Sequence, residues 1–218
     1  MELLRLSVLG GLLALDGTAV GQFMLSRPLV AGTLAGWLLG DAGTGLAVGA
    51  VLELYLLVSF PTGGARFPEG STATVVAAGT AAAIGGPGAL PLGVALGLLW
   101  GHLAGATVTL LRRVNARLVP GPETAASDVR LTRAHGVAVV LDFVRGTLVT
   151  GSGLAVGRLA LGPAATAWPL GREDSMALVL VGGVVSAGIL LHDFGGLRAQ
   201  RVWFLAGLLL GVLVPRLL

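Results

Sequence analysis

Two glutamates in the apolar first third of this chain are its strongest candidates for binding chemistry. Glu53 lies inside the run AVLELYLL, and Glu69 lies in the glycine-rich segment SFPTGGARFPEGST. A carboxylate at membrane depth is costly unless it is paired, protonated or in contact with water. It can also accept hydrogen bonds from hydroxyl groups in a fixed geometry. These residues therefore either contact the hydroxyl groups of a polar solute or have a structural role, and the sequence leaves both interpretations open.

The segment around Glu69 adds backbone groups to this candidate site. An irregular backbone presents free amide and carbonyl groups, and the lack of a side chain at Gly63 and Gly64 allows close approach of a ligand. We expect the contacts with a bound substrate to come from Glu53, Thr62, Gly63, Gly64, Ala65 and Glu69.

The other charged residues of this region are more typical of structural or gating positions. Asp16, Arg27 and Asp41 flank the first pair of apolar segments, where they would act as hinges, caps or ion-pair partners. Pro28 directly follows Arg27, as expected for the first turn of a helix. Arg66 could bind an anionic or hydroxylated ligand, but we favour its pairing with one of the two glutamates.

Composition places all of these residues in a membrane protein. Of the 218 residues, 55% are hydrophobic and 11% are charged, whereas charged residues make up about 25% of a soluble domain. The apolar runs lack the alternation of a barrel strand, so the spans must be helices. The chain is basic through arginine alone, and the arginines lie in short loops or singly in apolar sequence. This pattern indicates membrane orientation rather than nucleic-acid binding.

The length of the apolar runs divides the chain into two regions. Up to about residue 88 the runs are too short to span as straight helices, which predicts re-entrant hairpins or broken helices around a binding site. From residue 89 to 218 the runs are mostly longer, which predicts about four transmembrane helices. The short runs are residues 8–15, 29–40, 45–60 and 72–84, and the later runs are 90–111, 134–168, 175–191 and 202–214.

Arginine clusters between the later runs predict their orientation. The connection at about residues 112–133 carries five arginines and is assigned to the cytoplasm by the positive-inside rule, with residues 169–174 outside. Within the second of these runs, Asp142 and Arg145 are three residues apart on one predicted helix face, so we expect them to neutralise each other. No histidine cluster or cysteine suggests a catalytic centre or a metal site.

The motifs of the first third, taken in order, resemble the enzyme IIC component of the mannose/fructose/sorbose family of the bacterial phosphotransferase system (PTS). That family has an Asp before a first hairpin, then Arg-Pro-Leu, Leu-Gly-Asp, Gly…Leu-Glu, and a Gly-Ala loop that ends in Pro-Asp. Each motif alone is weak, but the ordered set is specific. The matching positions here are Asp16 and residues 27–29, 39–41, 52–53, 63–65 and 68–69.

The resemblance implies a membrane sugar-conducting subunit of a phosphoenolpyruvate-dependent PTS. Such a subunit translocates a hexose-type sugar together with a IID membrane partner, and a cytoplasmic IIB domain, recharged by IIA, phosphorylates the sugar. It takes no phosphoryl group itself, so no catalytic residue and no cofactor are expected here. The resemblance also implies a multi-pass protein in the lipid of the bacterial inner (plasma) membrane, in a homo-oligomer of IIC–IID pairs.

Two departures from the family pattern keep other functions open. Glu69 stands where family loops usually end in Asp, so the substrate or its pose is expected to differ. Family members are also longer, and a last crossing of the family pattern is expected to be missing. The alternatives are a non-transporting scaffold or sensor of an incomplete PTS, and an unrelated small-solute transporter.

Overall fold

The computed structural model describes residues 1–57, 59, 66–118 and 128–217, and these residues form eight helices and no strand. This confirms the all-α integral membrane class. Four helices are long and apolar enough to cross a membrane, in agreement with the predicted number. The helices are α1 (Glu2–Thr18), α2 (Pro28–Leu38), α3 (Ala42–Tyr55), α4 (Gly70–Ile84), α5 (Ala89–Leu118), α6 (Asp128–Thr166), α7 (Arg172–Asp193) and α8 (Gly196–Leu217).

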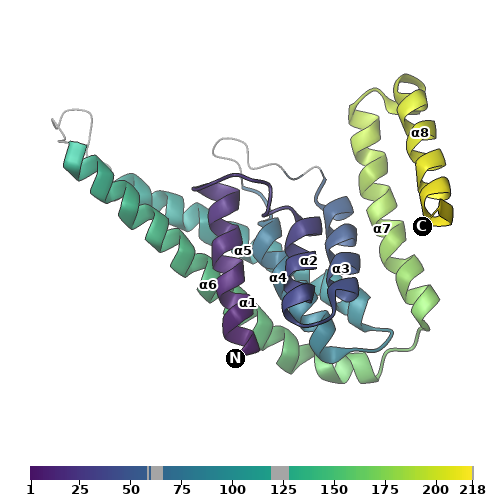
Figure 1. Ribbon diagram of the computed structural model, residues 1–218, viewed down its shortest axis with the longest axis horizontal. Helices are drawn as coiled ribbons and strands as arrows, with labels where there is room; N and C mark the ends of the chain where they lie inside the picture. The colour runs from purple at the N-terminus through teal and green to yellow at the C-terminus, as the bar shows by residue number, and fades with distance from the viewer. Residues whose placement is uncertain (58, 60–65, 119–127, 218) are drawn as a thin grey trace.

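The short helices α2 and α3 form a tight antiparallel hairpin (Figure 1). Glycines at the crossing allow this approach, since a Cβ atom at Gly45 would lie 2.2 Å from the carbonyl oxygen of Gly32. Small residues of this kind let membrane helices pack backbone against backbone. The hairpin holds Arg27, at the start of α2, beside Glu53, near the end of α3.

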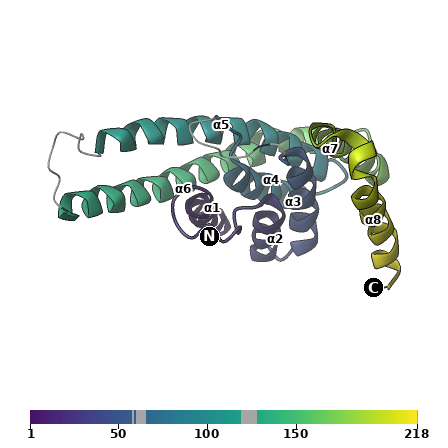
Figure 2. The same ribbon diagram turned by 90° about the horizontal axis from the view of Figure 1, so that it is seen from above.

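Helix α4 forms the centre of the molecule. Figure 2 shows it between α5 and α6 on one side and the α1–α3 group on the other. Residues 71–81 of α4 are all buried, and most are alanine, valine or threonine. Small side chains all round the helix allow five neighbouring helices to approach it, so a 15-residue segment too short to cross a bilayer is shielded by protein.

The long helices α5 and α6 run side by side and extend beyond the short helices (Figures 1 and 2). The indole N–H of Trp100 on α5 donates to the carbonyl oxygen of Val149 on α6 at 2.9 Å. Both helices include polar residues that the sequence placed in a connection, since α5 continues to Leu118 and α6 begins at Asp128. Beyond them, α7 and α8 form a hairpin whose outer helix, α8, contacts α7 alone among the described helices.

Candidate functional site

Both candidate glutamates line one cleft at the ends of the short helices. This cleft, here called the carboxylate cleft, has a volume of about 140 Å³. Its wall is formed by the end of α1, the start of α2, the end of α3 and the segment that enters α4. The polar side chains that line it belong to Thr18, Ser26, Arg27, Glu53, Ser59, Glu69 and Ser71.

Glu53 is held by the start of α2. Its Oε1 atom accepts a hydrogen bond from Nη2 of Arg27, and its Oε2 atom accepts one from the backbone N–H of Leu29 at 3.2 Å. Both charged side chains are partly exposed. A carboxylate has about four acceptor positions, so Glu53 can still accept hydrogen bonds from a ligand in the cleft.

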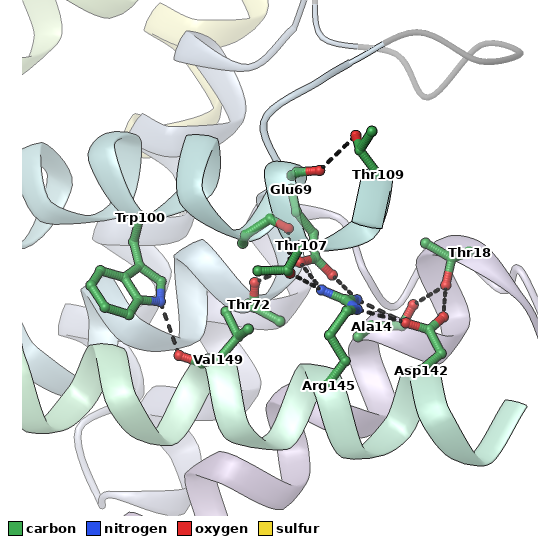
Figure 3. Close-up of polar contacts among 12 residues, drawn as sticks. Ala14, Thr18, Glu69, Thr72, Trp100, Thr107, Thr109, Asp142, Arg145 and Val149 are labelled. Carbon is green, nitrogen blue, oxygen red and sulfur yellow. Dashed lines mark hydrogen bonds and ion pairs between the residues drawn. The ribbon is translucent and has the colours of Figure 1, made fainter. Parts of the chain in front are cut away.

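Glu69 is part of a buried network centred on Arg145 of α6 (Figure 3). The guanidinium donates to both oxygens of Glu69 at 2.8 Å, to Asp142 at 2.9 Å and to the hydroxyl of Thr107 at 3.2 Å. The Thr72 hydroxyl donates to Oε2 of Glu69 at 3.0 Å. The side chains of Arg145 and Glu69 are 9% and 4% exposed. Their two-point contact is the strong, directional geometry of an arginine–carboxylate pair.

The network links four helices. Arg145 and Asp142 come from α6, Thr107 from α5, and Glu69 immediately precedes α4. The hydroxyl of Thr18, at the end of α1, contacts Asp142 (Figure 3). Two carboxylates and one guanidinium give this cluster a formal charge of −1. We refer to Thr18, Glu69, Thr72, Thr107, Asp142 and Arg145 as the Arg145 cluster.

Asp16 shapes the connection that brings Ser26 and Arg27 to the cleft. Its buried carboxylate accepts hydrogen bonds from the backbone N–H groups of Phe23 at 2.7 Å and Ser26 at 2.8 Å. Gln22 and Met24 in this connection adopt positive φ angles of 53° and 64°, which are uncommon for residues with a side chain. The hydrogen bonds to Asp16 stabilise this unusual backbone path.

Asp41 lies away from the cleft, at the opposite end of α3 from Glu53. It is the N-cap residue of α3, where its carboxylate accepts a hydrogen bond from the backbone N–H of Thr44 at 3.0 Å. Hydrogen bonds from the Thr44 hydroxyl and backbone N–H hold the pKa of Asp41 below its ordinary value. The position of Asp41 suits a structural role. Pro28, the other residue expected to have such a role at a helix start, is the first residue of α2.

The remaining predicted site residues have different outcomes. Thr62, Gly63, Gly64 and Ala65 lie outside the described residues. Arg66 is exposed, and the ion pairs of the described part of the chain join the two glutamates to Arg27 and Arg145 instead, so the expected pairing of Arg66 is not found.

The expected Asp142–Arg145 pair is present, but sequence reasoning missed its main partner. Glu69 is 76 residues away from Arg145 and immediately precedes a different helix, α4. The available signal was that a charged residue deep in an apolar run requires a buried partner of opposite sign.

The fold and the site together define a helical, multi-pass membrane protein with a charged cluster shielded among short, packed helices. A solved chain described as "Structure of membrane protein" has the same fold, with a TM-score of 0.66 and 17% identity over 99% of this chain and 94% of that one. The sequence profile of the family "PTS system sorbose-specific iic component" matches residues 1–191. The chain belongs to this family.

Curated relatives agree with the family assignment. The mannose-specific EIIC component of Escherichia coli K12 is 27% identical over 129 residues, which cover 59% of this chain and 48% of the relative. The sorbose-specific EIIC component of Lacticaseibacillus casei is 31% identical over 124 residues, covering 57% and 42%. That of Klebsiella pneumoniae is 28% identical over 114 residues, covering 52% and 42%. The matched region spans about half the length of these relatives or less.

Proposed function

We propose that this protein is a sugar-conducting membrane subunit of a phosphotransferase system and that a hexose-type sugar binds in the carboxylate cleft. The observation that carries the proposal is that Glu53 and Glu69, from separate segments, line the same cleft. Family membership and four candidate spans support it. The relatives named for mannose and sorbose support a hexose-type substrate.

The two glutamates would have different tasks in the cleft. Glu53 is partly exposed and has acceptor positions left after its bonds to Arg27 and Leu29, so it would bind sugar hydroxyls directly. Glu69 is buried, and both of its oxygens accept hydrogen bonds from Arg145, so it would fix one wall of the cleft. It would offer the sugar its remaining acceptor position. Ser26 and Ser71 add hydroxyl groups that can donate or accept.

The volume of the cleft, about 140 Å³, is small compared with the roughly 300–1,000 Å³ that is common for ligand sites. We propose that a IID-like membrane subunit completes the conducting unit. We also propose that IIA and IIB phosphocarriers supply the phosphoryl group from the cytoplasm. In this arrangement residues 1–88 form the sugar-site region and residues 89–218 form the transmembrane region. The assembly would be a homo-oligomer of such pairs in the bacterial inner membrane.

Sugar uptake in vesicles tests the proposal. Vesicles would carry this protein with its IID partner. They would contain the IIA and IIB phosphocarriers, phosphoenolpyruvate and the proteins that pass its phosphoryl group to IIA, and accumulation of labelled mannose and sorbose would be measured. We expect uptake that requires all components. Glu53→Gln removes the charge at nearly constant size, and we expect it to raise KM about tenfold or more, because a hydrogen bond to a charged acceptor contributes about 1.5–3 kcal/mol.

Asp41→Asn is the matched control, because it makes the same chemical change at the other end of α3 and retains a good N-cap residue. We expect uptake close to wild type. If Glu53→Gln and Asp41→Asn give the same KM as wild type while the complex assembles, the carboxylate cleft is not the sugar site. If no sugar accumulates in any combination but the phosphocarriers still bind, the scaffold alternative is favoured.

A further inference from the structure

A second polar cavity lies beside the carboxylate cleft and has no role in the function proposed above. It has a volume of about 300 Å³ and is bounded by the later part of α5, the earlier part of α6 and the end of α1. We call it the Asn115 chamber. The polar side chains that line it belong to Thr18, Arg112, Asn115, His135 and Asp142.

The chamber contains an acceptor that lacks a donor. The Oδ1 atom of Asn115 is buried and has no hydrogen-bond partner among the described residues. Buried polar atoms in native proteins are almost always satisfied, and an exception indicates an unseen partner. In a cavity large enough for a small ligand, a ligand hydroxyl is a suitable donor for this atom. His135, which lines the same chamber and is exposed, can donate or accept a further hydrogen bond.

Side-chain contacts form the boundary between the chamber and the cleft. Thr18 lines both cavities, and its hydroxyl contacts Asp142 of the chamber. Phe67 lines the cleft, and the guanidinium of Arg112, which lines the chamber, lies 5.5 Å from the centre of its ring. Side-chain rotamer changes are much faster than helix movements, and this boundary consists of side chains.

The charges around the chamber favour a neutral ligand. Asp142 and Arg112, which both line the chamber, have opposite charges, and the Asn115 side chain is uncharged. Asp142 also belongs to the Arg145 cluster, where Asp142 and Glu69 share the single guanidinium of Arg145. That cluster therefore has one negative charge in excess. A phosphorylated sugar would bring about two further negative charges next to these carboxylates. A neutral, hydroxyl-rich molecule would meet donors and acceptors without this repulsion.

We propose that the Asn115 chamber is a second sugar site, which the unphosphorylated sugar occupies after it leaves the carboxylate cleft. This inference rests on the proposed function. Asn115 accepts a sugar hydroxyl there, and separation of Thr18 from Asp142 opens the way from the cleft. The sugar thus has two consecutive places in this subunit on its way across the membrane.

The absence of cysteine from the chain permits a direct test. Ala138→Cys places one thiol in the chamber, Ser59→Cys places one in the cleft, and Val137→Cys, at a neighbouring exposed position, is the control. The rate of modification by a small charged methanethiosulfonate reagent is measured on the complex with the IID partner, with and without mannose or sorbose. With sugar at about ten times its Kd, we expect about tenfold slower modification in the chamber and the cleft. We expect no change at the control position.

A further variant links this protection to Asn115. Asn115→Leu in the Ala138→Cys background removes the acceptor at similar size. We expect the sugar concentration needed for half-protection of the chamber to rise about fivefold, as for the loss of one neutral hydrogen bond of about 1 kcal/mol. Protection of Ser59→Cys should not change with Asn115→Leu.

The outcomes separate the chamber from the proposed function. Protection of Ser59→Cys without protection of Ala138→Cys would overturn the chamber proposal and leave the cleft in place. Protection at neither position would remove the proposed function, and the chamber site with it. Stronger protection of Ala138→Cys by the sugar phosphate than by the free sugar would overturn the assignment of a neutral ligand. Equal protection with Asn115 and with leucine at that position would refute the role given to Asn115.

Discussion

Replacing Arg145 by methionine tests whether the Arg145 cluster holds the helices together. Arg145→Met removes the donors to Glu69, Asp142 and Thr107 and leaves two buried carboxylates without a counter-ion. Breaking one buried ion pair costs about 3–5 kcal/mol, and one substitution here affects two carboxylates, so we expect the upper end of that range. For a chain of this length, such a loss corresponds to a decrease in Tm of roughly 10–20 °C.

The assay is thermal unfolding of this protein, purified in detergent as the proposed complex with its IID partner, with two controls. Arg158→Met is the same substitution on the same helix, but Arg158 and its partner Glu2 are 30% and 65% exposed and 3.8 Å apart. An exposed pair contributes about 0–1 kcal/mol, so the decrease in Tm should be a few degrees at most. Adding Glu69→Gln to Arg145→Met removes one stranded charge and should restore part of the loss. Equal decreases for Arg145→Met and Arg158→Met would refute the reasoning.

Two further predictions concern the hairpin of α2 and α3. Gly45→Ala places a Cβ atom 2.2 Å from the Gly32 carbonyl oxygen and 2.7 Å from the Gly36 Cα atom. We therefore expect a destabilisation of about 1–3 kcal/mol, measured by thermal unfolding. Gly40→Ala is the control, because a Cβ atom there meets nothing within 4 Å and the substitution reports only the cost of a positive φ angle. Asp41→Ala should cost about 1 kcal/mol near neutral pH through loss of the N-cap of α3. Because folding lowers the pKa of Asp41, the stabilisation by its carboxylate is present above about pH 4 and is lost as the pH falls further. The difference in stability between wild type and Asp41→Ala should therefore shrink in acid. A stability difference that stays constant between pH 6 and about pH 3 would contradict this.

Much of the fold could be predicted from run lengths and composition. The short helices α2, α3 and α4 lie close to the predicted runs 29–40, 45–60 and 72–84, because glycine, proline and the charged residues interrupt the apolar sequence at their ends. The extension of α6 back to Asp128 could not be predicted in this way. That segment is polar, and hydropathy measures transfer into lipid rather than helix formation beyond the membrane.

The site was predictable in residue type but not in pairing. The cost of burying a charge indicated that Glu53 and Glu69 need partners, and local spacing predicted the Asp142–Arg145 contact. The partners of the glutamates are 26 and 76 residues away and depend on how α2 folds against α3 and α6 against α4. Arg66 is the arginine nearest to Glu69 in sequence, yet in the folded chain Glu69 forms its ion pair with Arg145.

Equilibrium binding of labelled mannose and sorbose to the purified complex tests the central claim most directly, since it does not depend on phosphoryl transfer. Wild-type protein, Glu53→Gln and Asp41→Asn would be compared at matched folding, verified by their Tm values. We predict that wild type and Asp41→Asn bind at least one of the sugars with similar Kd and that Glu53→Gln weakens binding about tenfold or more. Unchanged Kd in Glu53→Gln would contradict the assignment of the carboxylate cleft as the sugar site.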